Sequence, residues 1–240
     1  MSIDYYFENN PYVEKLPYKF NIELLREHLY DNVIPLGEPI IQGGAYGGAF
    51  GGWSVLANNG TWTGGWTQGH KAMKNGGFDY KIAKELGVVH DYSHDKPTEA
   101  CTGVFKQVLD KLESEGFVCR RVRTTVLQPG GQSSRHRDAP NDAYACRIHI
   151  PLVTYEGCVH TVWDDDNKEY PIHMPADGSV YILHVNNQHQ IVNPTDKPRY
   201  HIIMNAWDTK GIAQDESFHF EHIDVLKERV EIFNERVRTA

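Results

Sequence analysis

Apolar and polar positions alternate through much of the second half of the chain, and a two-residue period of this kind predicts β-strands. The predicted strands are 119–128, 146–153, 158–163, 169–174, 178–184, 189–192 and 199–207. Short strands with regular turns between them are typical of a double-stranded β-helix, the jelly-roll or cupin-like sandwich. We therefore predict a mainly β fold with a jelly-roll core and flanking α-helices.

A helical period appears on either side of this β region. Residues 21–30 place their apolar side chains on one face, with Asn21 as a plausible N-terminal cap. Residues 98–116 show the clearest apolar face in the chain, and Gly116 fits the end of that helix. Residues 216–237 are predicted to form a third, amphipathic helix.

The length of 240 residues and the hydrophobic content of 40% suit one domain with a sizeable core. Within it we expect an α/β elaboration and lid over residues 1–117, the jelly-roll core over 118–208, and the C-terminal helix over 209–240. Residues 1–20 are aromatic and broken by prolines, so we expect an irregular segment across the core surface.

The stretch 43–65 is rich in glycine and aromatic residues. Two interpretations stay open: a flexible linker or set of tight turns, and a lid that closes aromatic rings over a substrate. Under the second interpretation Trp62, Trp66 and Tyr46 are the lid residues, and Trp62 is our candidate substrate contact.

The net charge of −8 makes a nucleic-acid backbone binder an unfavourable interpretation, because such proteins need a basic surface. No apolar run is long enough to span a membrane, and the first residues do not resemble a signal peptide. The four cysteines are widely spaced, which is typical of reduced cysteines in a cytoplasmic protein.

The candidate chemistry lies in the predicted β region. His136 and Asp138 are two residues apart, so on an extended segment they share a face, and His189 follows in the turn region before the last strand. Two histidines and one carboxylate can hold Fe(II) and leave open positions for oxygen and substrates. Arg199 would provide a permanent, bidentate cation for a carboxylate co-substrate.

These residues carry a family resemblance. The chain resembles the aspartyl/asparaginyl β-hydroxylase family of 2-oxoglutarate oxygenases, and its free-proline hydroxylase relatives, at Thr125, Pro129, His136, Arg147-Ile-His149, Gly178, His189 and Arg199. The interval from His189 to Arg199 is ten positions (199 − 189), as the family pattern requires. The resemblance covers roughly the second half of the chain, and its combined motif is specific although each piece alone is weak.

The resemblance implies roles for these positions. The metal ligands and catalytic residues would be His136, Asp138 and His189. The co-substrate residues would be Arg199, His149 and Thr125. Arg147 would face substrate or co-substrate. The cofactors would be Fe(II), 2-oxoglutarate and O2, and the substrate an amino acid, free or within a peptide.

One position departs from part of the family. Animal peptidyl aspartyl hydroxylases have glycine where this chain has Asp138, which places the chain nearer the free-amino-acid branch. The carboxylate also argues against halogenation, because halogenases of this type need that position vacant for chloride.

Several alternatives stay open at the level of sequence. A lone His-x-Asp is more often a surface ion pair, His149 could be a hydrogen-bonded core residue, and His184 competes with His189 for the metal role. Our leading hypothesis is a dioxygenase that hydroxylates an unactivated C–H bond of an amino acid. The rivals are a non-catalytic jelly-roll module that binds a metal or small molecule and, ranked lower, a zinc hydrolase. A monomer and a homodimer are both compatible with the sequence.

Overall fold

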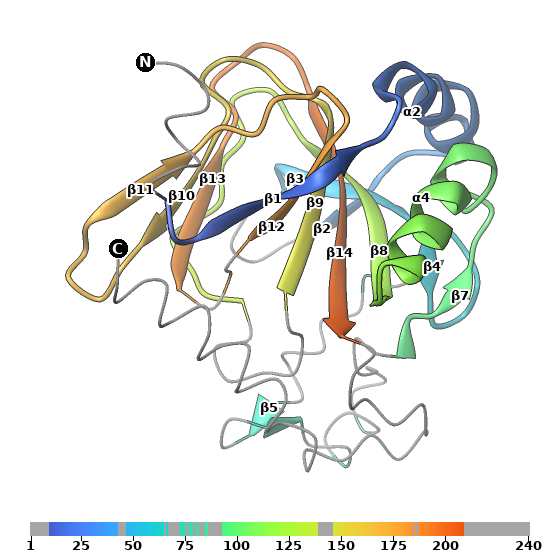
Figure 1. The fold of residues 1–240 in the computed structure, drawn as a ribbon, viewed down its shortest axis with the longest axis horizontal. Helices are drawn as coiled ribbons and strands as arrows, with labels where there is room; N and C mark the ends of the chain where they lie inside the picture. Colours follow the sequence, from blue (N-terminus) through green and yellow to red (C-terminus); the bar gives the residue numbers. More distant parts are fainter. Residues whose placement is uncertain are drawn as a thin grey trace.

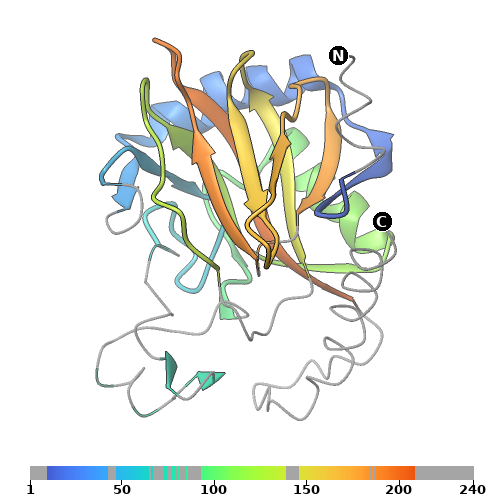
Figure 2. The same cartoon turned by 90° about the vertical axis from the view of Figure 1, so that its left-hand side faces the viewer.

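The computed structural model arranges the chain in three layers (Figure 1). It describes residues 10–42, 47–64, 66, 73–74, 77–78, 81, 85, 93–138, 146–183, 185 and 187–208. Two helices cover one face of a large antiparallel sheet, and a small antiparallel sheet lies over its other face (Figure 1). Figure 2 shows the small sheet in front and the helices behind.

The large sheet has seven strands in the order β1 (Val13–Lys19), β12 (Ser179–Leu183), β9 (Cys146–Val153), β14 (Arg199–Asp208), β8 (Phe117–Leu127), β3 (Phe50–Ser54) and β2 (Ile40–Gln42). The small sheet has the order β11 (Glu169–Ile172), β10 (Val159–Trp163) and β13 (Gln188–Val192). Two short pairs complete the strands: β4 (Leu56–Ala57) with β7 (Lys96–Pro97), and β5 (Met73–Lys74) with β6 (Gly77–Phe78). Every strand predicted from the alternating pattern is present with ends within two residues, and the jelly-roll core is confirmed.

The helices follow the predicted faces with one shift in position. Helix α2 (Ile22–His28) begins as predicted, because the Asn21 side chain accepts the backbone N–H groups of its first turn. A π-helical turn (Leu29–Val33) and a 3-10 turn (Ile34–Leu36) extend it. Helix α4 (Gly103–Ser114) starts five residues later than the predicted 98–116.

The late start of α4 has a local cause. The Thr98 hydroxyl donates to the Ser54 carbonyl at 2.6 Å and accepts the Ala100 N–H at 3.2 Å. Threonine that bonds the backbone in this way stabilises a turn in place of the first helical residues. The turn also joins the start of the helix to the end of β3.

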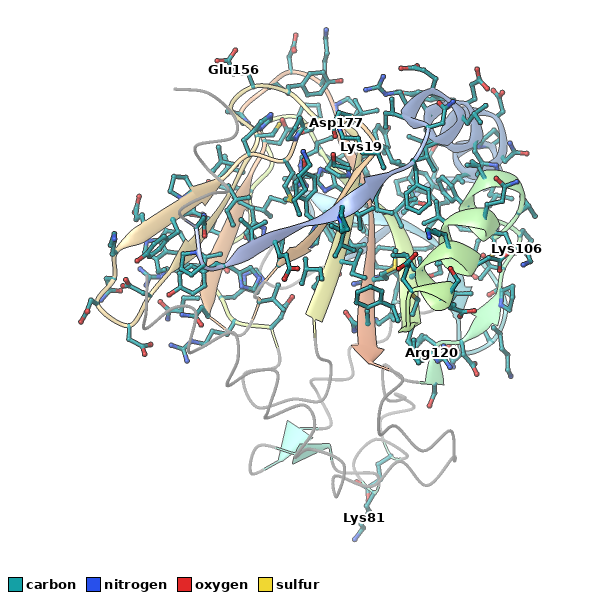
Figure 3. All side chains as sticks on the ribbon, viewed as in Figure 1. Lys19, Lys81, Lys106, Arg120, Glu156 and Asp177 are labelled. Atoms are coloured by element: carbon teal, nitrogen blue, oxygen red, sulfur yellow. The ribbon has the colours of Figure 1, made fainter. Side chains whose placement is uncertain are left out.

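The irregular conformation expected for residues 1–20 is wrong for Val13–Lys19, which form the edge strand β1 and pair with β12. Gly178 allows this approach. Its φ is +84°, and a Cβ there would lie 1.9 Å from the Phe20 carbonyl oxygen. Lys19 and Asp177 form an ion pair at the same junction, and Figure 3 shows the two side chains together at this edge.

Apolar packing is concentrated on the helix side of the large sheet. There α2 and α4 bury one extensive cluster, which includes Leu25, Phe105, Leu112, Ile148 and Ile202. Two smaller apolar clusters join the sheets, one formed mainly by β1, β10, β11 and β12 and the other by β3, β8, β13 and β14. Buried polar side chains also line the facing surfaces of the two sheets.

The predicted division at residues 117 and 118 stays a prediction, although β1, β2 and β3 extend the jelly-roll sheet from earlier in the chain. The predicted C-terminal helix and residues 43–46 of the glycine-rich segment lie outside the described residues. Within the described part of the chain, the helices are too short or too polar to cross a membrane.

Candidate metal centre

His136, Asp138 and His189 come together between the two sheets. Each offers one ligand atom, and the three atoms lie within 4.8 Å of one another. The nearest Asp138 carboxylate oxygens are 3.6 Å from His136 Nε2 and 3.8 Å from His189 Nε2. Two imidazoles and a carboxylate at this spacing form a set that could hold a divalent metal ion. The competing His184 lies outside the described residues.

Backbone hydrogen bonds fix the two segments that carry these residues. The His136 N–H donates to the His189 carbonyl at 3.0 Å, and the His189 N–H donates back to the His136 carbonyl at 2.8 Å. The Asp138 N–H donates to the Val185 carbonyl at 3.1 Å. The segment before Asp138 therefore runs beside β13 as an irregular extra strand, which brings distant sequence positions to one point.

The hydrogen bonds of the two histidine rings suit metal binding. His136 Nδ1 lies 2.8 Å from the Ser134 carbonyl, and His189 Nδ1 lies 3.0 Å from the Asn187 carbonyl. A carbonyl only accepts hydrogen bonds, so both Nδ1 atoms carry the proton and both Nε2 atoms present a lone pair. A backbone carbonyl on the non-ligating nitrogen is the usual support for a metal-bound histidine. Burial also lowers the pKa of His189 to about 4, which keeps the ring neutral as a metal requires.

Arg147 contacts the carboxylate of the set. Its Nη1 atom lies 2.5 Å from Asp138 Oδ2, and only a tenth of the arginine side chain is exposed. Burial favours the neutral acid, but the charge of Arg147, together with those of His189, His136 and Arg123, outweighs it and holds the pKa of Asp138 well below its usual range. Asp138 is therefore an anion at neutral pH, and its orientation is fixed by a charge-assisted hydrogen bond.

The turn between β13 and β14 determines where Arg199 lies relative to His189. The Asn193 amide nitrogen is 3.1 Å from the carbonyls of Leu127 and Gln128 and 2.8 Å from that of Lys197. These bonds tie the turn to the end of β8. The ten positions from His189 to Arg199 therefore span the end of β13, the turn that Asn193 holds, and the first residue of β14.

Arg199 is buried on the inner face of β14 and donates a hydrogen bond to His201. Its Nη2 atom lies 3.2 Å from His201 Nδ1. His149, on the neighbouring strand β9, is buried with its ring centroid 5.8 Å from that of His201. The structure therefore brings together Arg199 and His149, two residues to which the family resemblance gives a co-substrate role.

Thr125 lies on the same inner face, directly across from His201 in the pairing of β8 with β14. Its hydroxyl donates to the His201 carbonyl at 3.1 Å. In this arrangement the hydroxyl proton is already used, so Thr125 can offer a ligand only an acceptor oxygen.

The aromatic side chain predicted to contact substrate lies elsewhere. Trp62 packs against the helix-side core, and its ring atoms are 3.0 Å from the position of a Cβ on Gly37. Trp66 lies on the inner side instead, 5.0 Å from the Arg123 guanidinium, with its ring centroid 6.4 Å from that of Phe50. The substrate role predicted for Trp62 is therefore not supported by its position, since the loop turns it toward the other layer.

Sequence reasoning missed two inner-face residues, His160 and His201. His160 stacks on His189 with a centroid distance of 5.1 Å and an interplanar angle of 13°. His201 is two residues from Arg199, and His160 is two residues from the buried Val162. The two-residue strand period, applied outward from Arg199 and Val162, is the signal that could have found both.

A sequence model of the aspartyl/asparaginyl β-hydroxylase family matches residues 71–209, which is more than half of the 240 residues. The matched segment contains all three members of the ligand set and Arg199. The chain belongs to this family. It is an Fe(II)- and 2-oxoglutarate-dependent dioxygenase that uses O2, and its donor set of two neutral imidazoles and one carboxylate fits that metal. A search of curated protein sequences gave no match.

Solved structures of related type were also found. A 2-oxoglutarate–Fe(II) oxygenase family oxidoreductase from Burkholderia pseudomallei aligns at 14% identity and a TM-score of 0.47, covering 81% of this chain and 85% of that chain. A Pseudomonas putida prolyl-4-hydroxylase aligns at 11% identity and a TM-score of 0.46, covering 84% and 94%.

Proposed function

We propose that this dioxygenase hydroxylates an unactivated C–H bond of an amino acid, free or within a peptide. In the balanced reaction one oxygen atom of O2 enters the C–H bond and the other enters succinate, while 2-oxoglutarate loses CO2. The observation that carries the proposal is the cluster of His136, Asp138 and His189 within the segment that matches the hydroxylase family.

The ligand set would hold Fe(II) through His136 Nε2, His189 Nε2 and one Asp138 oxygen, and would leave three coordination positions for ligands. When bound, Fe(II) together with 2-oxoglutarate and O2 supplies the oxidising chemistry. The protein holds the two imidazoles in the tautomer that presents Nε2, and Arg147 keeps Asp138 ionised. These contacts prepare the donor atoms before the metal binds.

Arg199 would bind the distal carboxylate of 2-oxoglutarate, with His149 and Thr125 lining the same pocket. Arginine suits this role because it keeps its charge when buried, and Arg199 is only 4% exposed.

The substrate would enter near Arg147 and Arg123. Both guanidinium-bearing residues are buried on the inner face, and Arg147 already contacts a metal ligand, so a substrate carboxylate bound there would lie beside the metal. Trp66 packs on Arg123 and is our proposed replacement for Trp62 in contacting the substrate. We further propose a cytoplasmic location, because the thiols of Cys101 and Cys158 form no disulfide in the part of the chain that the structure describes.

Succinate formation with a panel of free amino acids and short peptides tests the function. We expect a substrate-dependent rise in succinate and a product heavier by one oxygen atom, measured by mass spectrometry. Asp138→Ala should abolish both, whereas Asp165→Ala should not, because the Asp165 side chain is 97% exposed. Equal succinate from wild type and Asp138→Ala would contradict the proposal. Iron-loaded protein that never consumes 2-oxoglutarate would favour the non-catalytic binding module.

A further inference from the structure

Five buried ring nitrogens on the inner face have no hydrogen-bond partner among the described residues. They are Nδ1 and Nε2 of His149, Nδ1 and Nε2 of His160, and Nε2 of His201. The three side chains are between 1% and 5% exposed. A buried polar atom without a partner costs about 1–3 kcal/mol, so a cluster of five indicates that a polar ligand completes the site.

The histidine rings form a continuous row from the metal set to Arg199. His160 stacks on the ligand His189, and its ring centroid is 6.1 Å from that of His149. His149 is followed by His201 at 5.8 Å, and His201 contacts Arg199. One end of the row therefore lies at the metal set and the other at the buried guanidinium.

The contact with Arg199 fixes the tautomer of His201. A guanidinium only donates hydrogen bonds, so His201 Nδ1 accepts from Arg199 and the ring proton is on Nε2. That Nε2–H is one of the atoms without a partner among the described residues. His201 thus orients Arg199 and presents a second donor beside it.

The histidines of the row would act as neutral donors and acceptors. Burial lowers the pKa of His201 well below the ordinary value, and the nearby Arg199 lowers it further. A neutral imidazole still offers one N–H donor. These rings can therefore hydrogen-bond an anion without adding positive charge beside the metal and the arginine.

We propose that His160 and His201 complete the 2-oxoglutarate site, with His160 donating to the keto-acid end at the metal and His201 to the distal carboxylate. His201 is also a positioning residue, because it holds Arg199. This inference rests on the proposed function, and it assigns the two ends of the co-substrate to different histidines.

Two ligands distinguish binding at the metal end of the site from binding at the Arg199 end. 2-Oxoglutarate carries both ends, whereas 2-oxopentanoate keeps the keto-acid end and lacks the distal carboxylate. Isothermal titration calorimetry of the Mn(II)-loaded protein under nitrogen measures binding of each ligand without turnover. The variants are His160→Phe and His201→Phe, which keep a buried ring and remove its N–H, with His160→Gln to restore a donor.

We expect His160→Phe to weaken both ligands by about 10- to 100-fold, since each loses one hydrogen bond from an anionic group. His201→Phe should weaken 2-oxoglutarate to a similar degree and leave 2-oxopentanoate unchanged. His160→Gln should recover part of the affinity. Mn(II) affinity should be the same in all variants, which excludes collapse of the metal set.

The contrary results are distinct. Unchanged affinity of both ligands for His160→Phe would overturn its role and assign the ring to packing against His189. Equal loss of both ligands in His201→Phe would overturn the assignment of the distal end. Absence of 2-oxoglutarate binding in the wild-type protein would overturn the proposed function itself.

Discussion

The two faces of strand β14 differ sharply in chemistry. Ile202 and Met204 point into the apolar core beneath the helices, while Arg199, His201 and Asn205 are buried on the opposite face. The alternation of side chains along β14 thus places apolar residues in the core beneath the helices and polar residues between the two sheets. The helix side stabilises the fold through apolar burial, whereas the inner side buries charge and hydrogen-bonding groups at a cost.

The neighbouring strand β9 repeats the difference. Ile148 and Ile150 belong to the helix-side core, and Arg147 and His149 are buried on the inner face. Buried apolar area contributes about 25 cal/mol per Å², but a buried polar group without a partner is destabilising. The polar part of the sandwich interior is therefore arranged for ligands, whereas the core beneath the helices, with the two smaller clusters between the sheets, provides the apolar burial.

The largest effect is expected from shortening a side chain in the core on the helix side of the large sheet. Ile202→Ala should lower the free energy of unfolding by about 2–5 kcal/mol, because it leaves a cavity in a packed core. Its 2-oxoglutarate affinity at a temperature where the variant is folded should match the wild type. Urea denaturation measures the first quantity and calorimetry the second.

The inner-face counterpart of Ile202→Ala is His149→Phe, because His149 lies on β9, the strand that pairs with β14. It should weaken 2-oxoglutarate binding by about 10-fold or more and leave stability equal or higher, because it removes two buried ring nitrogens that have no partner among the described residues. A large loss of stability with unchanged affinity would reverse the roles assigned to the two faces.

An intermediate effect is expected at Arg147. Arg147→Met keeps the buried apolar stem and removes the charge that holds Asp138 in place. Metal affinity should fall by about 10- to 100-fold, the usual effect of losing a residue that supports a ligand. Mn(II) titration followed by electron paramagnetic resonance measures it, with the exposed Arg137→Met as the control. Equal Mn(II) affinity in both variants would limit Arg147 to substrate binding.

The smallest effect expected for a single residue is the contribution of each buried histidine to the pH dependence of stability. The folded-state pKa values of His149, His160 and His201 are depressed by burial, so below the unfolded pKa of about 6.5 the unfolded chain binds more protons. Stability of the metal-free protein should therefore fall as pH drops from 6.5, by about 1.4 kcal/mol per pH unit for each such group. Denaturation midpoints at pH 7.5, 6.5 and 5.5 test this. A pH-independent midpoint over that range would contradict the buried, neutral state of these rings.

The sequence predicted the elements whose patterns are strictly periodic, and failed where long-range contacts decide. Edge strand β1 was not predicted, because Pro17 and its aromatic neighbours have the composition of a loop. An edge strand nevertheless tolerates proline. His136 and Asp138 were predicted from their two-residue spacing, and the structure brings both together with His189. His160 was not predicted, because its place depends on how the small sheet stacks on the large one. Trp62 was predicted on the substrate side, because the composition of a loop does not indicate which layer of the fold a tryptophan ring packs against.

The most direct test of the metal and co-substrate site is anaerobic titration of the Fe(II)-loaded protein with 2-oxoglutarate, followed by visible absorption. We expect a weak metal-to-ligand charge-transfer band in the wild type that saturates with 2-oxoglutarate. The band should be lost in Asp138→Ala and should need much more 2-oxoglutarate in Arg199→Ala. Iron-loaded wild-type protein without such a band would contradict the central claim that the inner face holds Fe(II) and 2-oxoglutarate together.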